Sequence, residues 1–480
     1  MKKVDLLLIN PYYHKRTGSS TLFPLGLGYI SRFVRDNGFT VKIIDCALYF
    51  DDITLINSFK DWFEKIVLKI DPLLIGIGPT TTPSIKSIIE INKICRNRLK
   101  KTPIIYGGPL ASIESQKWLF SDVLEADAVI SGAGEYIVVD ILKYLKKNTE
   151  SGEIKEIISN VITAHSNKEL NLDECNYPDR SYNRQYKPSI RRDLFLYPVA
   201  TVVGSRGCPR SCNFCVSGSF NNYRRRNFLS IVEEMKFLVK DKNIKSLIFF
   251  DDCFFPNRTT VNQEIESFTK QIVARKLDVS WQIEMPPDIL SEIEIENFRN
   301  LIKAGCRQIN IGFETNNNHD LKSFNKHYNL NKVKNKCDEI KSLKNLLKIN
   351  GTFILTSTNS SINSIDDIIY YSKNLNLLFA HFNPLFLYPG TNLYDSVFPD
   401  QPKRWFEMIL SKEDFYGEIL YKNNNFNDNE IINQVSKAYK CFYDKDWESM
   451  AYKIFTNKFN TIKTKINQIK MNRFNQYDQI

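Results

Sequence analysis

Residues 204–215 read GSRGCPRSCNFC, and this stretch decides the fold of the chain. It holds three cysteines in a C-x3-C-x2-C array: Cys208, Cys212 and Cys215. Three thiolates so close together can share one soft metal centre, and they leave a fourth ligand position open. A structural zinc site is closed by four protein ligands, whereas an iron–sulfur cluster takes its thiolates from a tight loop. The array therefore predicts a [4Fe–4S] cluster with one iron free for a substrate or cofactor.

The residues around the array support this prediction. The array follows a strand-like apolar run, residues 197–203, and precedes a helical pattern. Gly204 and Gly207 let the backbone curl around a cluster, whose sulfides can accept hydrogen bonds from loop N–H groups. The alternative is a trio of buried or zinc-binding cysteines, but an accidental array rarely lies between a strand and a helix.

Length and composition describe an ordinary globular protein of two or three domains. The chain has 480 residues, of which 42% are hydrophobic and 25% charged. The seven other cysteines are scattered, so no disulfide framework is indicated, and an oxygen-sensitive cluster needs a reducing compartment. The apolar run Met1–Ile9 ends at Asn10 and Pro11, too early for a signal peptide or a membrane segment. We expect a cytoplasmic protein without a transmembrane segment.

The net charge of +11 raises the question of a nucleic-acid partner. Lysine and arginine are spread along the chain, however, and part of the excess lies in a lysine-rich segment, residues 453–470. The abundance of asparagine, isoleucine and lysine is typical of an AT-rich coding bias. A polyanion site and contact with an anionic membrane stay open as alternatives, and we expect neither nucleic acid nor a membrane as the partner.

Residues 1–150 alternate short apolar runs with helical patterns, which is typical of a parallel α/β sheet. A five-stranded open, Rossmann-like sheet is predicted, with its ligand outside the carboxyl ends of the strands. The predicted strands are Val4–Ile9, Val41–Asp45, Leu73–Gly78, Ile104–Gly107 and Ala128–Ser131. The predicted helices are Leu25–Asn37, Ser84–Arg98, one near Ser115–Phe120, and Tyr136–Lys146.

The turns after these strands consist of small residues: GIGPTTT at 76–82, GGP at 107–109 and GAGE at 132–135. Such turns would form a smooth-walled cleft that admits a large ligand close to the backbone. Neither G-x-G-x-x-G after the first strand nor G-x-x-x-x-G-K-[ST] is present, so neither a dinucleotide nor a triphosphate is favoured. Glycine turns alone are equally compatible with any α/β sheet.

The remainder divides into three parts. Residues 151–195 form a polar connector without a sustained period. Residues 196–398 contain six strand–helix units, which predict a partial (β/α)6 barrel with its chemistry at the carboxyl ends of the strands. Residues 399–480 predict a mostly helical C-terminal domain. Its aromatic residues are interpreted as core: Trp405, Phe406, Tyr439, Phe442, Tyr443, Trp447 and Tyr452.

The cysteine array, with an aromatic residue just before its last cysteine, resembles the radical S-adenosylmethionine (radical SAM) superfamily. The segment PLGLGYI at 24–30 and the turns at 76–82, 107–109 and 132–135 follow, in order, the pattern of the cobalamin-binding domain fused in front of many such enzymes. One departure is the missing D-x-H-x-x-G motif of cobalamin mutases. Because no histidine lies between His14 and His165, the resemblance implies a cobalt without a protein histidine beneath it.

The resemblance implies roles for individual residues. Cys208, Cys212 and Cys215 match the cluster ligands, and Phe214 matches the position whose backbone faces the adenine of SAM. Together with Phe214, the implied SAM contacts are Asp251, Asp252, Glu314 and Thr356. The implied cobalamin contacts are Leu25, Gly26, Thr80, Thr81, Gly107, Gly108, Gly132, Gly134 and Glu135.

Two of these assignments have open alternatives. Asp251 and Asp252 match the family position that binds the amine of SAM, but a pair of acids at the end of a strand also fits a helix N-cap. We rank Asp251 above Asp252, because strand alternation lets only one of two neighbours point inward. Thr356 stands where the family often has glycine. The neighbouring Cys253 is a candidate catalytic thiol, with simple packing as its alternative.

The implied reaction is the cleavage of SAM to a 5′-deoxyadenosyl radical, followed by cobalamin-dependent methyl transfer to an unactivated carbon of a small molecule or natural product. An external one-electron donor of the flavodoxin or ferredoxin type is implied as partner. The alternatives are a radical SAM cyclase or rearrangement enzyme, with or without cobalamin, and an RNA-modifying enzyme such as a methylthiotransferase. The last family carries three more cluster cysteines in its first domain, where this chain has only Cys46 and Cys95.

Overall fold

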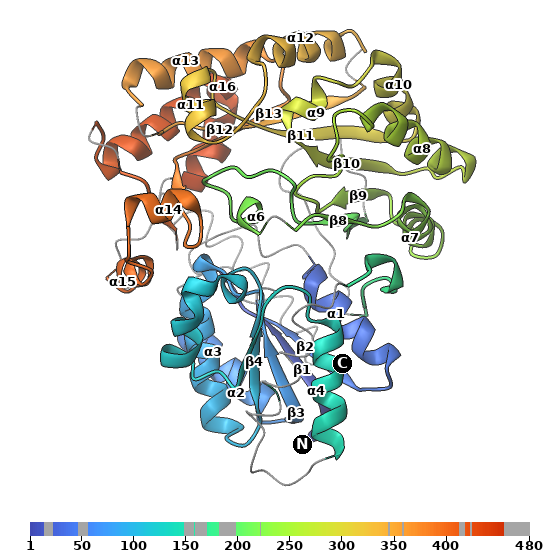
Figure 1. Cartoon of the computed structure of the whole chain (residues 1–480), viewed down its shortest axis with the longest axis vertical. Coiled ribbons are helices and arrows are strands. Elements are labelled where there is room, and N and C mark those ends of the chain that lie inside the picture. The colour runs from blue at the N-terminus through green and yellow to red at the C-terminus, as the bar shows by residue number, and fades with distance from the viewer. Residues whose placement is uncertain are drawn as a thin grey trace.

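A computed structural model describes residues 1–13, 23–46, 56–147, 158, 170–181, 198–220, 222–343, 346–357, 360–411, 418–422 and 425–455. Two units built on parallel sheets lie end to end, with the amino-terminal unit at the bottom of Figure 1 and the larger unit above it. Among the described residues, no helix is long and apolar enough to cross a membrane.

The amino-terminal unit is the predicted five-stranded open sheet. All its strands are parallel, in the order β2-β1-β3-β4-β5. The strands are β1 (Lys2–Asn10), β2 (Val41–Asp45), β3 (Ile70–Ile77), β4 (Ile104–Gly107) and β5 (Ala128–Ile130). The order reverses between β1 and β3, and a ligand in such a sheet binds in the crevice at that switch point.

Helices cover both faces of this sheet, which explains why β1 is apolar in consecutive positions. One face packs against α2 (Ile56–Val67) and α3 (Ile85–Arg98), and the other against α1 (Leu25–Asp36) and α4 (Glu135–Lys147). Helix α2 was not predicted. The helix expected near residues 115–120 is instead a series of short turns that ends in a π-helical turn, Leu119–Val123.

The second unit is a partial barrel whose six strands are all parallel, in the order β13-β12-β11-β10-β9-β6. They are β6 (Val199–Val202), β9 (Ser246–Phe249), β10 (Ser280–Met285), β11 (Cys306–Glu314), β12 (Lys348–Ile354) and β13 (Phe379–Asn383). The outer face packs against α7 (Phe228–Lys240), α8 (Val261–Ala274), α10 (Ile295–Lys303), α12 (Leu330–Lys341) and α13 (Ile362–Asn374).

The side chains of β10 point alternately to the hydrophobic core and to the lumen of the barrel. Trp281, Ile283 and Met285 are buried in the core shared with the helices. Gln282 and Glu284 must therefore face the inner side, because successive side chains of a strand point to opposite faces.

The last of the six strands expected in residues 196–398 spans Ala380–Tyr388 in the sequence pattern, and the structure breaks it in two at Pro384. Strand β13 ends at Asn383, and β14 (Phe386–Leu387) leaves the barrel sheet to pair antiparallel with β15 (Ile419–Leu420). Proline has no N–H to donate to a ladder, which accounts for the break.

The described part of the C-terminal segment is mostly helical, as expected, and its elements extend the two preceding cores. Trp405 and Phe406, on α15 (Arg404–Leu410), join the core of the amino-terminal unit. Tyr439, on α16 (Asp428–Phe455), joins the barrel core. The side chains of Trp447 and Tyr452, residues 456–480 and most of the predicted connector lie outside the described residues.

Candidate functional site

The cysteine array lies on a loop that leaves the carboxyl end of β6. We call residues 207–218 the cluster loop. It begins after β7 (Ser205–Arg206), which pairs with β8 (Arg224–Arg225). Gly207 has a φ of +78°, and a Cβ there would lie 2.1 Å from the carbonyl oxygen of Asn222, so this position requires glycine. A Cβ on Gly218 would lie 2.9 Å from the carbonyl oxygen of Arg210, because the loop folds back on itself.

The three thiols are partly buried and close enough to influence one another. Burial raises the pKa of Cys212 to about 11, an effect that Lys326 opposes. Burial also raises the pKa of Cys215, whereas N–H groups of Gly218 and Ser217 lower it by hydrogen bonding to the sulfur. A hydrogen bond from the Cys253 thiol lowers the pKa of Cys208 to about 7. Backbone donors aimed at the sulfurs fit thiolate ligands of an iron–sulfur cluster.

The described residues form no preassembled site for a single metal ion. Within the part of the chain that the structure describes, no three histidine, cysteine, aspartate or glutamate side chains converge closely enough to hold one ion. Zinc would draw its sulfur ligands to about 2.3 Å from one point.

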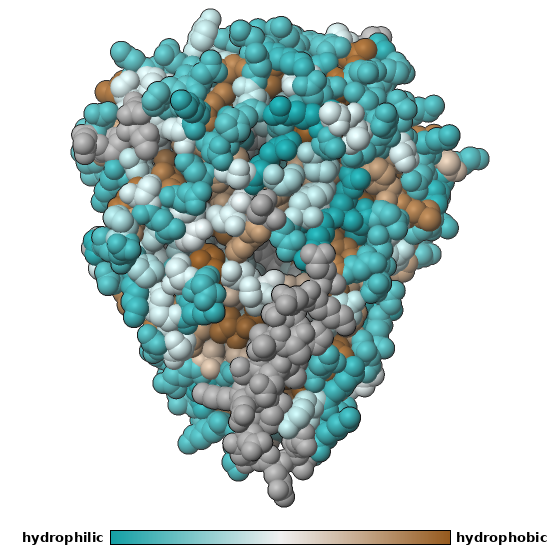
Figure 2. Space-filling model, in the orientation of Figure 1, coloured by the Kyte–Doolittle hydropathy of each residue, from teal (hydrophilic) through white to brown (hydrophobic). Residues whose placement is uncertain are grey.

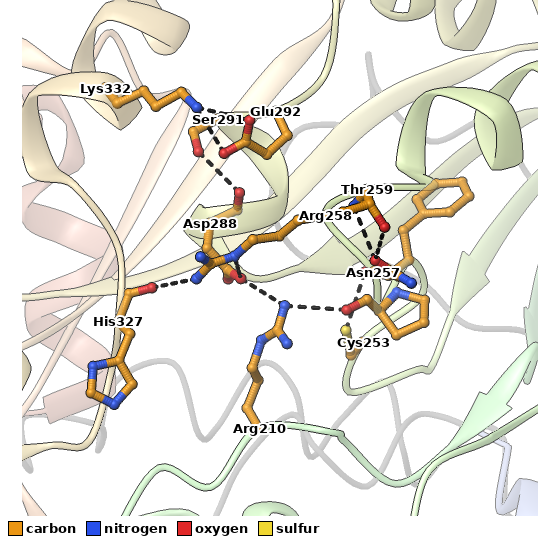
Figure 3. A network of polar contacts seen from close by, with 12 residues as sticks. Arg210, Cys253, Asn257, Arg258, Thr259, Asp288, Ser291, Glu292, His327 and Lys332 are labelled. Atoms are coloured by element: carbon orange, nitrogen blue, oxygen red, sulfur yellow. Dashed lines mark hydrogen bonds and ion pairs between the residues drawn. The ribbon is translucent and has the colours of Figure 1, made fainter.

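Arg210 anchors the cluster loop to the barrel. Its Nη2 donates to Asp288 at 2.6 Å and to the carbonyl oxygen of Pro256 at 3.2 Å. Arg258 reaches the same Asp288 oxygen from the other side at 2.7 Å and also donates to the carbonyl oxygen of His327 at 2.6 Å, as Figure 3 shows. Two guanidinium groups sharing one carboxylate hold the middle of the loop in place.

The loop is clamped from the opposite side by α11 (Asn318–Ser323) and the residues that follow it. The Asn213 N–H donates to the carbonyl oxygen of Phe324 at 3.1 Å, and Asn325 Nδ2 donates to that of Ser211 at 2.8 Å. The ring of Phe214 packs edge-on against Phe324 with centroids 5.3 Å apart. The backbone around Phe214 is thereby held rigidly beside the three cysteines.

The two neighbouring acids, Asp251 and Asp252, lie in different surroundings. Asp251 is buried, and its carboxylate accepts hydrogen bonds from the Gly204 N–H at 3.0 Å and from Ser205 Oγ at 2.6 Å. Asp252 is exposed toward the loop, hydrogen-bonds Ser217, and raises the pKa of Cys208 and Cys215 through its charge. Strand β9 ends at Phe249, so alternation no longer governs these two residues.

Glu314 ends β11, as predicted, with a φ of +65° beside an irregularity in the strand register. Its Oε1 accepts a hydrogen bond from Lys326 Nζ at 2.7 Å, and Lys326 also bonds the carbonyl oxygen of Gly312. The charge of Glu314 reaches Cys212 and raises the pKa of that thiol. The structure therefore brings Glu314 to the mouth of the barrel already paired with a lysine.

Thr356 and Cys253 have internal partners. The Thr356 hydroxyl is buried and accepts a hydrogen bond from the Leu385 N–H at 3.0 Å, so it links β12 to the segment after β13. The buried Cys253 thiol lies 3.4 Å from the carbonyl oxygen of Phe255. Thr356 is thus not presented to a ligand. The neighbouring Thr358 and Asn359 lie outside the described residues.

The sequence reasoning missed Glu284 and a set of amides on the inner barrel wall. Glu284 lies near the end of β10 with an exposed side chain, and desolvation by the surrounding barrel wall first, and then the charges of Asp252 and Asp251, raise its pKa to about 7. Gln282, Gln308, Asn310 and Asn350 form hydrogen bonds with one another across three adjacent strands. Polar residues at every second position of β10 and β11 were the available signal.

A cavity of about 390 Å³ opens at the carboxyl edge of the first sheet, at its switch point. Seven of the nine predicted cobalamin contacts line it: Leu25, Gly26, Gly107, Gly108, Gly132, Gly134 and Glu135. Two barrel residues, Arg206 and Phe250, line it from the other side. Figure 2 shows hydrophobic residues around a hollow at the level where the two units meet.

Thr80 and Thr81 are the two predicted contacts that do not line this cavity. Thr80 is fully buried, and its Oγ1 accepts a hydrogen bond from the Ala111 N–H at 3.2 Å. Thr81 and Ser84 cap the short helical turn that follows β3. Both threonines therefore shape the turn beneath the cavity rather than its wall.

The lining fits a large, flat cofactor. A Cβ added to Gly26 or Gly132 would meet no atom within 4 Å, so both positions leave open space at the wall. Gly108 adopts a φ of +118°, and a Cβ there would lie 2.4 Å from the Thr80 nitrogen. None of the described lining residues is a histidine, and His14, which follows the lining residue Tyr13, lies outside the described residues.

The two cysteines of the amino-terminal unit do not form a second cluster site. Cys46 and Cys95 are fully buried, and burial raises the pKa of Cys95 to about 12 and that of Cys46 well above its usual value. Thiols held neutral in an apolar core are unreactive. The methylthiotransferase alternative has no support in the part of the chain described.

Comparisons with known proteins agree with this geometry. A model of the radical SAM superfamily matches residues 202–368, and a model of the B12 binding domain matches residues 16–142. The chain is 26% identical to an uncharacterized methyltransferase of Pyrococcus horikoshii, over 92% of this chain and 93% of that protein. It is 24% identical to the hopanoid C-3 methylase of Methylococcus capsulatus, over 65% of this chain and 57% of that protein.

The fold is also shared with a solved structure. The radical S-adenosylmethionine methyltransferase TsrM of Kitasatospora setae, determined with cobalamin and a [4Fe–4S] cluster bound, matches with a TM-score of 0.59 at 15% identity. The match covers 83% of this chain and 78% of that chain. With an amino-terminal B12 binding domain and a radical SAM barrel in one chain, this protein belongs to the cobalamin-dependent group of the radical SAM superfamily.

Proposed function

We propose that this enzyme transfers a methyl group to an unactivated carbon of a small molecule, using SAM, a [4Fe–4S] cluster and cobalamin. One observation carries the proposal: the cavity at the switch point of the first sheet is lined by Arg206 and Phe250 of the barrel as well as by the glycine turns. A ligand held by the glycine turns would therefore face the barrel mouth. When bound, the cluster supplies the electron that cleaves SAM, and cobalamin carries the methyl group.

The residues of the chain hold and orient these groups. We assign Cys208, Cys212 and Cys215 as the cluster ligands, held by the backbone donors and by the Arg210 anchor described above. Asp252 is the better placed of the acid pair to accept hydrogen bonds from the SAM amine, because its carboxylate faces the cysteines. Phe214, through its backbone, and Glu314, through the carboxylate that Lys326 orients, complete the SAM site.

The segment that follows the barrel sheet contacts the amino-terminal unit at two places, which would help to hold the two cofactor sites in fixed positions. Trp405 Nε1 donates to Gln116 Oε1 at 2.7 Å, and the Pro389–Tyr394 turn places Gly390 against the side chain of Ile113. Fixed positioning of two reacting groups contributes a large part of catalysis in a transfer reaction. An external one-electron donor, of the flavodoxin or ferredoxin class, would reduce the cluster.

The test is an anaerobic reconstitution with iron, sulfide, cobalamin and SAM carrying a 13C-labelled methyl group. We expect about four irons and one corrinoid per chain, reductive cleavage of SAM, and 13C in a product formed from a small-molecule extract. A protein without corrinoid absorption but with undiminished product formation would contradict the role of cobalamin. A labelled SAM cleaved without methyl incorporation into any product, while a new ring forms, would favour the cyclase alternative.

A further inference from the structure

In the part of the chain that the structure describes, two neighbouring strands of the inner barrel wall each carry a buried hydrogen-bond acceptor without a partner. They are Gln308 Oε1 on β11 and Asn350 Oδ1 on β12, and both side chains are only 6% exposed. Buried polar atoms are nearly always bonded, because an unpaired acceptor loses its hydration without compensation. Two such unpaired acceptors on neighbouring strands indicate a position at which a bound molecule supplies the hydrogen-bond donors.

The register places these acceptors beside each other and beside Glu284. Asn310 pairs with Glu284 across β10 and β11, and with Asn350 across β11 and β12. Gln308 lies two residues before Asn310 on the same face of β11. We call Glu284, Gln308 and Asn350 the acceptor wall.

The hydrogen bonds within the wall determine which atoms stay free. Glu284 accepts a hydrogen bond from Asn310, which must present its Nδ2 to the carboxylate. Asn310 Oδ1 then accepts hydrogen bonds from Gln308 Nε2 at 3.1 Å and from Asn350 Nδ2 at 2.8 Å. Turning either amide around would set two oxygens against each other. The ionised carboxylate of Glu284 thus leaves both outer amide oxygens directed away from the network.

The charge of this region favours a cationic ligand. The strongest charges acting on Glu284 are those of other carboxylates, Asp252 and Asp251. The nearby Lys326 is already bonded to Glu314 and to the Gly312 carbonyl oxygen. A positively charged donor would relieve the repulsion among these acids and fill both free amide acceptors.

We propose that the acceptor wall is the substrate-recognition site and that the substrate is a small polar molecule with an amine, amidine or guanidine group. This rests on the proposed function, since Glu284 of the wall lies close enough to Asp252 and Asp251 at the barrel mouth for their charges to act on it. A hydrocarbon skeleton in the lumen would leave the two amide oxygens unpaired and Glu284 desolvated. Discrimination against molecules without the donor group is strong at such sites, because the polar groups of the protein then stay unpaired.

The test uses methylguanidinium and tetramethylammonium as probes, since they carry the same charge and only the first has N–H donors. Binding to the full-length, cluster-loaded enzyme with SAM bound is measured by saturation-transfer NMR and calorimetry. We expect methylguanidinium to bind at millimolar concentration and at least about tenfold more tightly than tetramethylammonium. Equal affinities, or no binding of methylguanidinium at millimolar concentration, would overturn the proposal without any variant being needed.

Two variants assign the binding to the wall. Glu284→Gln keeps the shape of the side chain and removes its charge, so methylguanidinium should bind about tenfold more weakly. The matched control is Glu296→Gln, which removes an exposed acid on the outer helix α10 and should leave probe binding unchanged. Undiminished binding in Glu284→Gln would overturn the assignment. Iron and corrinoid contents measured on the same samples report separately on the proposed function, because the probe does not depend on cobalamin.

Discussion

Arg206, in the strand that leads into the cluster loop, donates a hydrogen bond of 2.7 Å to Glu135 at the amino-terminal end of α4. Arg206 also lies over the ring of Tyr29, 5.2 Å from its centroid. Both partners of the ion pair line the cavity of the amino-terminal unit. The pair therefore joins the loop that carries the cysteines to the site that we assign to cobalamin.

Replacement of Glu135 by Gln should loosen this junction. The Glu135 side chain is 2% exposed and that of Arg206 is 32% exposed. Removing one charge from a partly buried pair should lower the free energy of unfolding by about 1–2 kcal/mol, less than for a fully buried pair because water reaches the arginine. Chemical denaturation measures the effect, and corrinoid retained after gel filtration should fall in parallel. Glu174→Gln, at an exposed acid that accepts a hydrogen bond from Tyr136, is the control and should retain its corrinoid.

Replacement of Cys212 by Ala should abolish the cluster and with it the cleavage of SAM under reducing conditions. Two remaining thiolates cannot hold a cluster that needs three protein ligands. Iron analysis and the formation of 5′-deoxyadenosine measure the two losses. Cys441→Ala, at an exposed cysteine on α16, should keep both. A Cys212→Ala protein with about four irons and full SAM cleavage would refute the assignment of the array.

Bulk at the cavity wall should displace cobalamin, and Gly26 is the position at which to add it. A Cβ at Gly26 meets no atom within 4 Å, whereas one at Gly108 would collide with the backbone of Thr80 and strain a positive φ. Gly26→Phe should therefore weaken corrinoid binding about tenfold or more while the iron content stays unchanged. Gly26→Ala, which adds only the Cβ, serves as the control. Normal corrinoid binding by Gly26→Phe would contradict the placement of the cofactor beside α1.

The two neighbouring acids should respond differently to loss of charge. Asp252→Asn should weaken SAM binding about ten- to a hundredfold, because a charge-assisted hydrogen bond contributes about 1.5–3 kcal/mol. Asp251→Asn should change SAM affinity much less, since its carboxylate is bonded to Gly204 and Ser205. Calorimetry with SAM compares the two variants directly. A larger loss in Asp251→Asn would restore the order expected from the sequence.

Asp251 should also make stability depend on pH. Burial raises the pKa of its carboxyl from 3.8 to about 7, so the folded protein binds a proton that the unfolded chain releases. The stabilisation that comes from this raised pKa is therefore fully present below about pH 4. As the pH rises from about 4 to about 7, the free energy of unfolding should fall by roughly 4 kcal/mol, and above about pH 7 this contribution no longer changes.

Urea denaturation of the wild type and of Asp251→Asn between about pH 4 and about pH 7 measures how steeply the free energy of unfolding falls with pH. The variant should lose this part of the slope, because an amide does not titrate. An identical slope in the two proteins would place the titrating group elsewhere, with Glu284, whose pKa is also raised to about 7, as the next to test.

Local patterns in the sequence determined the chemistry and the architecture. The C-x3-C-x2-C spacing specifies a cluster loop, and alternating strand and helix periods specify two parallel sheets, because both properties depend on residues close together in the chain. The glycine turns after β4 and β5 likewise predicted five of the residues that line the cavity, and the segment at 24–30 predicted two more.

Only the tertiary structure decided which side chains meet. Strand β9 ends before Asp251, so alternation does not decide where the two acids point, and hydrogen bonds from Gly204 and Ser205 fix the position of the Asp251 carboxyl instead. The hydroxyls of Thr80 and Thr356 are buried because each accepts a hydrogen bond from a backbone N–H that is distant in sequence, Ala111 and Leu385 respectively. The acceptor wall arises from the register of three strands separated by intervening helices. Such contacts depend on long-range packing, and no periodicity within one segment encodes them.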